Sequence, residues 1–419
     1  DTAVTGAKLN DDAISGQGAL GAAPADTDEF LVSDAGVLKR VDYSYIKGIT
    51  QTSFLPTANP LFINGNMAVA QRGTSSGAID TSGVNTVDRM YWALNGSGDQ
   101  YTCTQEALTS GAAFEDGFAN AARLDCSTAS GGANMTGASD YLYLQYNFEG
   151  QDLQVFKKGT SNAETMTISF WVKCNKTGTG SIQLQDTDNS NRQCTQSYTI
   201  SVADTWEKKI CAFGADTTGA FDDDNAKSLS VNWWLGSGTN YNSGTANNGV
   251  WEAQDNTQVN ADGTLAMNDS TSNDWAITGI QMDVGTYTTA DLPPFRHESY
   301  GANLQRCQRY YYRVNPLATA NAPISMGSMF TTSTAFGVLS FPVNMRAVPT
   351  TDITSGAGYY VLNCNSASDG FDEFSASFTG ATTTGTDLYG SNTLSQTSGA
   401  AGKMRFNDTA AKVAVTAEL

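Results

Sequence analysis

Leu229-Ser-Val-Asn-Trp-Trp-Leu235 alternates large apolar residues with small polar ones up to its second tryptophan. A period of two predicts a β-strand that turns one face toward a core. Other stretches repeat this period, with apolar positions at Leu142, Leu144, Tyr146 and Phe148, at Met166, Ile168, Phe170 and Val172, and at Ile280, Met282 and Val284. Such half-apolar strands are typical of antiparallel sheets with one covered face. Because Gly/Asn/Asp loops separate them, they predict an antiparallel β-sandwich, or jelly roll, over residues 61–313.

Two further regions flank this sandwich. Residues 1–60 contain one predicted β-hairpin, with strands at Phe30–Ser33 and Val37–Tyr43, followed by a linker over residues 51–59. Residues 314–419 return to β signals between Thr/Ser/Gly-rich loops, which predicts a second, smaller β-sandwich domain. The expected fold class is therefore all-β, with less than about 10% helix.

One segment departs from the β pattern. In residues 299–313, Leu304, Cys307 and Tyr311 fall at i, i+3 and i+7, a spacing that predicts a short helix ended by Pro316. A lone hairpin and a narrow apolar helix stripe both need partners. We therefore expect a parallel homotrimer in which these elements lie near the three-fold axis, with interface residues Phe30, Val32, Leu304, Cys307 and Tyr311.

The composition excludes several classes of protein. The 419 residues include 23 Lys+Arg and 42 Asp+Glu, a formal charge of −19, which repels nucleic acid and anionic membranes. No apolar run approaches the roughly 20 residues that span a bilayer. The sequence does not begin with Met and shows no signal peptide, so we expect an N-terminal anchor outside it. Seven cysteines without a CxxC pair are expected to be reduced and mostly buried.

The segment Leu61-Phe-Ile-Asn-Gly-Asn-Met-Ala-Val-Ala-Gln-Arg-Gly73 resembles the central module of many phage tail fibres, which is similar to carbohydrate-binding-module jelly rolls. The resemblance continues at residues 87–92, 168–173, 274–285 and 294–313. The hairpin at residues 26–43 also looks like short modules of marine and cyanobacterial phage fibres. Together these segments frame roughly three-fifths of the chain. The resemblance implies a commonly trimeric fibre on the virion surface, assembled in the host cytoplasm, with its far end free to meet the host.

The function expected from this resemblance is attachment of a phage to its host by multivalent, non-catalytic glycan binding. The expected partners are a host surface glycan and, through the N-terminal anchor, other virion structural proteins. A head-attached or capsid-decorating fibre is one alternative, and a glycan-degrading tailspike is another. We expect no enzyme and no catalytic residue, because the single histidine, His297, lies in a segment that the resemblance makes structural. No repeat typical of a β-helix depolymerase is present either.

Four aromatic residues are candidates for stacking on a sugar ring. Trp171 and Trp234 alternate onto the polar faces of their strands, beside Lys173 and Asn232. Tyr241 and Trp251 lie in residues 236–273, a long loop without apolar periodicity, and loops of that length are usually functional. A large aromatic residue on a polar face is either covered by another segment or available to a ligand, and the sequence leaves both options open.

Two acidic stretches offer hard oxygen ligands that suit Ca²⁺. They are Asp186-Thr-Asp-Asn-Ser190 and Asp222-Asp-Asp-Asn225, with candidate ligands Asp186, Asp188, Asp222 and Asp224. The first begins like an EF-hand loop but lacks the later glycine and glutamate of that motif. A solvated acidic loop is the alternative, so the sequence predicts no firm metal site and no other cofactor.

Overall fold

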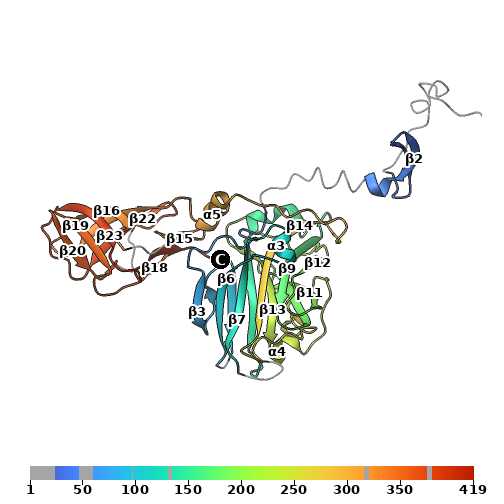
Figure 1. Cartoon of the computed structure of the whole chain (residues 1–419), viewed down its shortest axis with the longest axis horizontal. Helices are drawn as coiled ribbons and strands as arrows, with labels where there is room; N and C mark the ends of the chain where they lie inside the picture. The colour runs from blue at the N-terminus through green and yellow to red at the C-terminus, as the bar shows by residue number, and fades with distance from the viewer. Residues whose placement is uncertain (1–23, 47–59, 97, 131–134, 316–319, 375–379) are drawn as a thin grey trace, which may run out of the picture. The chain divides into compact units, whose positions relative to one another are not determined.

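The computed structural model describes residues 24–46, 60–96, 98–130, 135–315, 320–374 and 380–419. Of these, the residues within 60–289 and 294–419 form one compact unit, and the N-terminal hairpin belongs to another. The expected linker at residues 51–59 lies outside the described residues. Seen as ribbons, the described part consists mainly of strands (Figure 1).

The N-terminal hairpin is confirmed. Its strands β1 (Glu29–Asp34) and β2 (Val37–Asp42) pair antiparallel, with Glu29 opposite Asp42. Ala35 and Gly36 both have positive φ, at 49° and 83°, which is the turn geometry that matches the twist of a two-residue hairpin loop. The side chains of Phe30 and Val32 are exposed in the hairpin.

Two six-stranded antiparallel sheets form the sandwich. The first, sheet C, has the order β11-β10-β13-β8-β5-β4. Its strands are β4 (Gly83–Val84), β5 (Tyr91–Asn95), β8 (Tyr141–Glu149), β10 (Gly178–Asp186), β11 (Arg192–Ile200) and β13 (Lys227–Ser237). The second, sheet B, has the order β12-β9-β14-β7-β6-β3. Its strands are β3 (Ser75–Ile79), β6 (Gln100–Ala107), β7 (Asn120–Thr128), β9 (Met166–Cys174), β12 (Glu207–Phe213) and β14 (Asp274–Val284).

The sandwich core lies where the period-two pattern predicts it. The apolar positions of β8, β9 and β13 are buried, and Trp233 is fully buried among them. Val284 at the end of β14 is only partly buried but packs against the same core. Short helices connect the strands: α3 (Ala112–Glu115), η2 (Gly150–Asp152), η3 (Gln154–Phe156), α4 (Thr239–Asn242) and η4 (Asn256–Gln258). Alternation along each strand leaves the opposite face of sheet C to polar and aromatic residues.

The predicted short helix is confirmed as α5 (Tyr300–Gln308). Ser299 is its N-cap, and the Ser299 Oγ accepts from the backbone N of Ala302. The helix is shorter than expected, because the chain then forms the strand β15 (Tyr311–Arg313). The side chains of Cys307 and Tyr311 are buried inside this same chain, and Leu304 packs against the sandwich core. The apolar stripe expected at a three-fold axis therefore faces the core of its own chain.

The C-terminal region has a core of its own. A three-stranded sheet has the order β15-β24-β18, with β18 (Thr350–Ile353) and β24 (Val413–Thr416). A seven-stranded sheet, sheet E, has the order β20-β19-β23-β16-β17-β22-β21. Its strands are β16 (Pro323–Met329), β17 (Ala335–Ser340), β19 (Tyr360–Cys364), β20 (Ala367–Phe371), β21 (Glu373–Phe374), β22 (Gly385–Ser391) and β23 (Ala401–Phe406). With 8% helix and 42% strand, the all-β fold class is confirmed.

One ion pair joins the sandwich to the C-terminal region, and another ties the end of α5 to β8 within the sandwich. Arg89 Nη1 donates to Glu418 Oε2 at 2.8 Å, and the Arg89 guanidinium lies 3.5 Å from the centre of the Tyr310 ring. Arg309 donates to both oxygens of Glu149, at 2.9 and 2.7 Å. Burial alone raises the pKa of Glu149, but hydrogen bonds from Arg309 and Tyr310 hold it below its ordinary value.

All seven cysteines are buried, and none forms a disulfide within the chain. No helix in the described part of the chain has the length and apolar content to cross a membrane.

Candidate functional site

The register of sheet C places two large aromatic side chains side by side on its polar face. Trp234 of β13 lies opposite Tyr143 of the neighbouring strand β8. Because Trp233 points into the core, its neighbour Trp234 points to the other face. The ring centroids of Trp234 and Tyr143 are 4.7 Å apart.

Two more tyrosines complete a four-ring cluster. Tyr141 precedes Tyr143 on the same face of β8, and their ring centroids are 5.3 Å apart. Tyr241, from α4 in the long loop, lies 5.3 Å from Trp234 and 5.8 Å from Tyr141, again between ring centroids. The loop therefore folds back over the sheet and brings Tyr241 to the strand residues.

A row of side-chain amides crosses the sheet beside these rings. Gln145 Nε2 donates to Asn232 Oδ1 at 2.9 Å, and Asn232 Nδ2 donates to Gln183 Oε1 at 3.0 Å. Gln183 Oε1 also accepts from Trp234 Nε1 at 3.2 Å, while its Nε2 donates to Gln193 Oε1 at 3.4 Å. These bonds fix the ring of Trp234 and satisfy polar groups that are buried.

The rings and amides enclose a cavity of about 130 Å³, here called the aromatic–amide pocket. Its lining residues are Tyr141, Tyr143, Gln183, Gln185, Asn232, Trp234, Tyr241, Asn256 and Val259. This volume is below the range of about 300–1,000 Å³ typical of drug-sized ligand sites, so it has room for one small ring of a larger ligand. None of the lining side chains is charged.

Several polar groups of the pocket are available to a ligand. Within the described residues, the hydroxyls of Tyr141, Tyr143 and Tyr241 and the side-chain amide of Gln185 have no hydrogen-bond partner. Burial raises the pKa of the Tyr143 and Tyr241 phenols, with neighbouring tyrosines adding to the shift. Both hydroxyls therefore stay protonated at neutral pH and can donate as well as accept.

The structure brings Trp234 and Tyr241 into this pocket and places the other two aromatic candidates elsewhere. Trp171 lies on β9 of sheet B, where its Nε1 donates to Asp116 Oδ2 at 2.9 Å and Lys208 lies over the ring. Trp251 is only 8% exposed, and its Nε1 donates to the backbone O of Gly214 at 2.8 Å. Both rings are thus held by neighbours in the chain.

Sequence reasoning missed Tyr141 and Tyr143. The signal was present, because both alternate with Leu142 and Leu144, which were assigned to the core face of the same strand. What the sequence did not contain was the pairing of β8 with β13, which sets the two tyrosines beside Trp234. Cross-strand neighbours of this kind depend on register, and a single sequence does not determine it.

Of the residues considered for Ca²⁺, Asp186 does not fit a metal ion, because a lysine already occupies the position beside its carboxylate. Lys158 Nζ lies 2.5 Å from Asp186 Oδ2 and 3.0 Å from Asp216 Oδ2. It also donates to the backbone O of Thr218 at 3.0 Å and of Gly219 at 2.8 Å. All three charged side chains are buried, so this ammonium supplies the positive charge that the oxygens require.

The carboxylates of two other calcium candidates, Asp188 and Asp224, also have partners within the chain. Asp188 Oδ2 accepts from the backbone N of Asp222 at 2.9 Å, and Asp224 Oδ1 accepts from Ala226 N at 2.8 Å. In the described part of the chain, no group of three or more His, Cys, Asp or Glu side chains is arranged to hold a metal ion. These acidic residues therefore order loops by capping backbone N–H groups.

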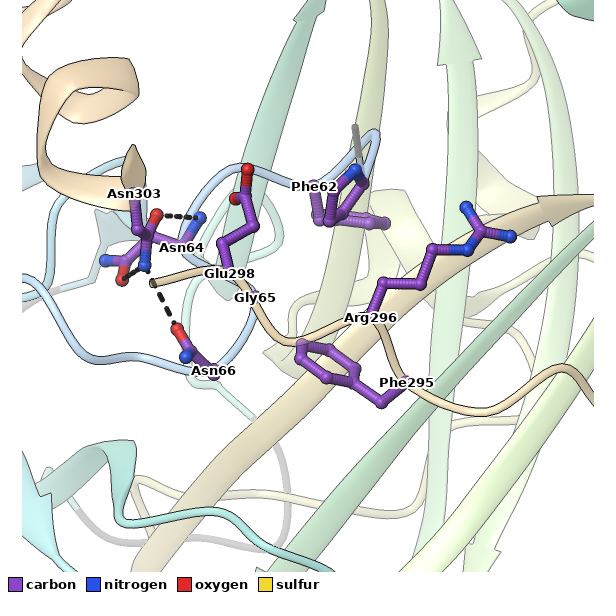
Figure 2. Close-up of a pocket in the computed structure, with 9 residues that line it drawn as sticks. Phe62, Asn64, Gly65, Asn66, Phe295, Arg296, Glu298 and Asn303 are labelled. Carbon is purple, nitrogen blue, oxygen red and sulfur yellow. Dashed lines mark hydrogen bonds between the residues drawn. The ribbon is translucent and has the colours of Figure 1, made fainter. Parts of the chain in front are cut away.

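A second, smaller cavity lies between the first and last segments of the sandwich (Figure 2). Asn303 of α5 donates to the side-chain oxygens of Asn64 and Asn66 at 3.2 and 3.1 Å, and its Oδ1 accepts from Asn64 N at 3.0 Å. The volume is only about 10 Å³, the space of a single water. We therefore assign this region to the packing of the fold.

The imidazole ring of His297 packs against two phenylalanine rings. Its centroid is 5.3 Å from Phe118 and 4.8 Å from Phe295. It lines neither this cavity nor the aromatic–amide pocket. His297 therefore belongs to an aromatic cluster with Phe118 and Phe295.

No family model matches the chain, and no curated protein matches it. Among solved structures, it is similar to the enzymatically active domain of tailspike protein 4 of bacteriophage CBA120, at 10% identity and a TM-score of 0.26, over 47% of this chain and 19% of that one. The chain thus spans about a fifth of that tailspike domain.

Two carbohydrate-binding modules are also similar. One is the family 11 module of Clostridium thermocellum in complex with a β-1,3-1,4-mixed-linked tetrasaccharide, at 13% identity and a TM-score of 0.25, over 51% of this chain and 98% of that one. The other is the CBM22-1 xylan-binding domain of Paenibacillus barcinonensis, at 12% identity and a TM-score of 0.24. The match covers 52% of this chain and 100% of that one. These TM-scores are too low to carry an argument about function.

Proposed function

We propose that the chain is a non-catalytic glycan-binding protein, and that its aromatic–amide pocket holds one ring of the glycan. The observation that carries the proposal is the combination of the four-ring cluster with unpartnered hydroxyls and an amide around a 130 Å³ cavity. A pyranose has apolar C–H faces and a hydroxyl rim, so it needs an aromatic surface and short polar groups together.

The pocket favours a neutral glycan over an acidic one. None of its lining side chains is a cation that would pair with a uronate or a sulfate, and the whole chain carries a formal charge of −19. An anionic sugar is repelled by the negative charge of the chain, and the pocket has no cationic side chain to offset this repulsion. Affinity for the ligand should therefore change little with ionic strength.

The proposed setting is a bacteriophage fibre that attaches to the host surface, as the resemblance of residues 61–313 implies. Single protein–sugar contacts are weak, because a sugar exchanges good hydration for hydrogen bonds of similar strength. A homotrimer would present three pockets at once and gain affinity through effective concentration. The same pocket offers no support for glycan cleavage, because hydrolysis needs two carboxyl groups and none lines it.

A glycan array probed with the full chain tests this proposal. We expect binding to neutral glycans, with little or no binding to uronate-rich or sulfated ones. Tyr241→Ala should raise the dissociation constant about fivefold, since one stacking ring contributes on the order of 1 kcal/mol. Tyr300→Ala is the control, because Tyr300 is 60% exposed and lies away from the pocket. Binding only to anionic glycans, or equal binding by both variants, would contradict the proposal.

A further inference from the structure

The outer face of sheet E carries an exposed apolar surface outside the proposed glycan site. Met326 on β16 is 69% exposed and Val338 on the adjacent strand β17 is 64% exposed. They border an open groove of about 660 Å³. Exposed apolar residues that cluster on one face mark a surface that binds another macromolecule.

Aromatic rings extend this surface along the sheet. Phe330 is 63% exposed and stacks on Phe336, with ring centroids 4.5 Å apart and planes within 5°. Phe336 in turn contacts Tyr389 of β22 at 4.2 Å between centroids. We name the set Met326, Phe330, Phe336 and Val338 the sheet-E face. Thioether, valine and phenylalanine side chains offer few hydrogen bonds, so the sheet-E face suits an apolar protein surface better than a sugar.

Two opposite charges flank the sheet-E face. Asp387 of β22 pairs in register with Val338, and Lys403 of β23 pairs in register with Met326. Across the order β22-β17-β16-β23 the row therefore reads acid, apolar, apolar, base. Three strand spacings separate its ends by about 14 Å, so the two charges cannot pair with each other. Within the described residues, neither charge has an ion-pair partner.

We propose that the sheet-E face binds a second copy of this chain. A row with an acid at one end and a base at the other is complementary to itself: the apolar residues of two copies pack together, and Asp387 of one copy meets Lys403 of the next. The contact forms either as a two-fold pair or repeated head to tail around a three-fold axis, and both arrangements close. The occupant is thus specified by the charges as well as by the apolar area.

Sedimentation equilibrium of the full chain, run from nanomolar to high micromolar concentration, measures this association. The wild type should form dimers or trimers. Val338→Asp should raise the dissociation constant at least about tenfold, because it buries a charge in the apolar centre. Val348→Asp is the matched control, since Val348 is exposed to a similar degree, at 58%, and does not line the groove.

A charge swap tests the pairing itself. Asp387→Lys and Lys403→Asp should each weaken association about fivefold or more, and the double variant should recover most of the loss, because it restores opposite charges. A wild type that stays monomeric throughout overturns the proposal, as does a double variant no better than the singles. Glycan binding by monomeric Val338→Asp, measured on the same array, is a separate readout, so failure of the copy contact and failure of the glycan site are distinguishable.

Discussion

Tyr143 and Trp234 lie opposite each other on adjacent strands of sheet C, with their ring centroids 4.7 Å apart and their planes inclined by 40°. Trp234 is nearly buried, at 4% exposed, whereas Tyr143 is only half-buried. The tryptophan therefore forms the floor of the aromatic–amide pocket, and the tyrosines form its reachable surface. This division predicts that tyrosine substitutions test binding, while Trp234 substitutions also disturb the fold.

Substitutions of two glutamines on β10, Gln183 and Gln185, should affect stability and glycan binding differently. Gln183 Oε1 accepts from both Asn232 Nδ2 and Trp234 Nε1, so Gln183→Leu leaves two buried donors without a partner. We expect the free energy of unfolding to fall by about 2 kcal/mol or more, measured by urea denaturation. Gln185→Leu should change stability by less than about 0.5 kcal/mol and yet weaken glycan binding, because its amide is unpartnered. Equal stability losses in the two variants would contradict the stabilising role assigned to the hydrogen bonds of Gln183.

Because Lys158 pairs with Asp186 and Asp216, we expect the stability of the sandwich not to depend on divalent cations. The wild type should unfold at the same temperature with calcium and with a chelator. Lys158→Ala leaves Asp186 and Asp216 buried without their cation and should cost about 3–5 kcal/mol. Added Ca²⁺ should then raise the melting temperature of this variant, since the freed carboxylates and carbonyl oxygens are ligands that calcium accepts.

The neighbouring Lys157 provides the control for this experiment. Its side chain is 53% exposed and pairs with Glu164 at the surface, so Lys157→Ala should change stability by well under about 1 kcal/mol. A wild type that is stabilised by calcium, or a Lys157→Ala variant as unstable as Lys158→Ala, would show that Lys158 is not the cation of this site.

Asp88 should give the fold a measurable pH dependence. Burial raises the pKa of Asp88 to about 6, although Arg72 and hydrogen bonds from Gln71 act in the opposite direction. A carboxyl group whose pKa is higher in the folded state favours folding while protonated. Its contribution is therefore complete below the unfolded pKa near 4 and is lost as the pH rises through about 6.

The comparison with Asp88→Asn isolates this contribution. Unfolding free energies of wild type and variant, measured between pH 4 and pH 7, should diverge by on the order of 3 kcal/mol, with the wild type losing stability relative to the variant as the pH rises. Asp80→Asn is the control, because Asp80 is exposed, and its profile should run parallel to that of the wild type. A constant difference between wild type and Asp88→Asn would contradict the assigned shift.

The sequence predicted the strands and their faces well, because the period-two pattern is a local property. The core positions of β8, β9 and β13 and the outward direction of Trp234 all follow from it. The pattern does not determine which distant segments of the chain come into contact. Lys158 meets Asp186 across 28 positions and Tyr241 reaches Trp234 only through the fold of a loop, so neither the occupied cation position nor the complete pocket was predictable.

The most direct test of the proposed glycan site is a crystal structure of the full chain with the tightest-binding neutral glycan from the array. We expect one sugar ring in the aromatic–amide pocket, in contact with Tyr241 and Tyr143, with its hydroxyls hydrogen-bonded to Gln185 and the phenol groups. Glycan bound at another surface, with this pocket filled only by water, would contradict it.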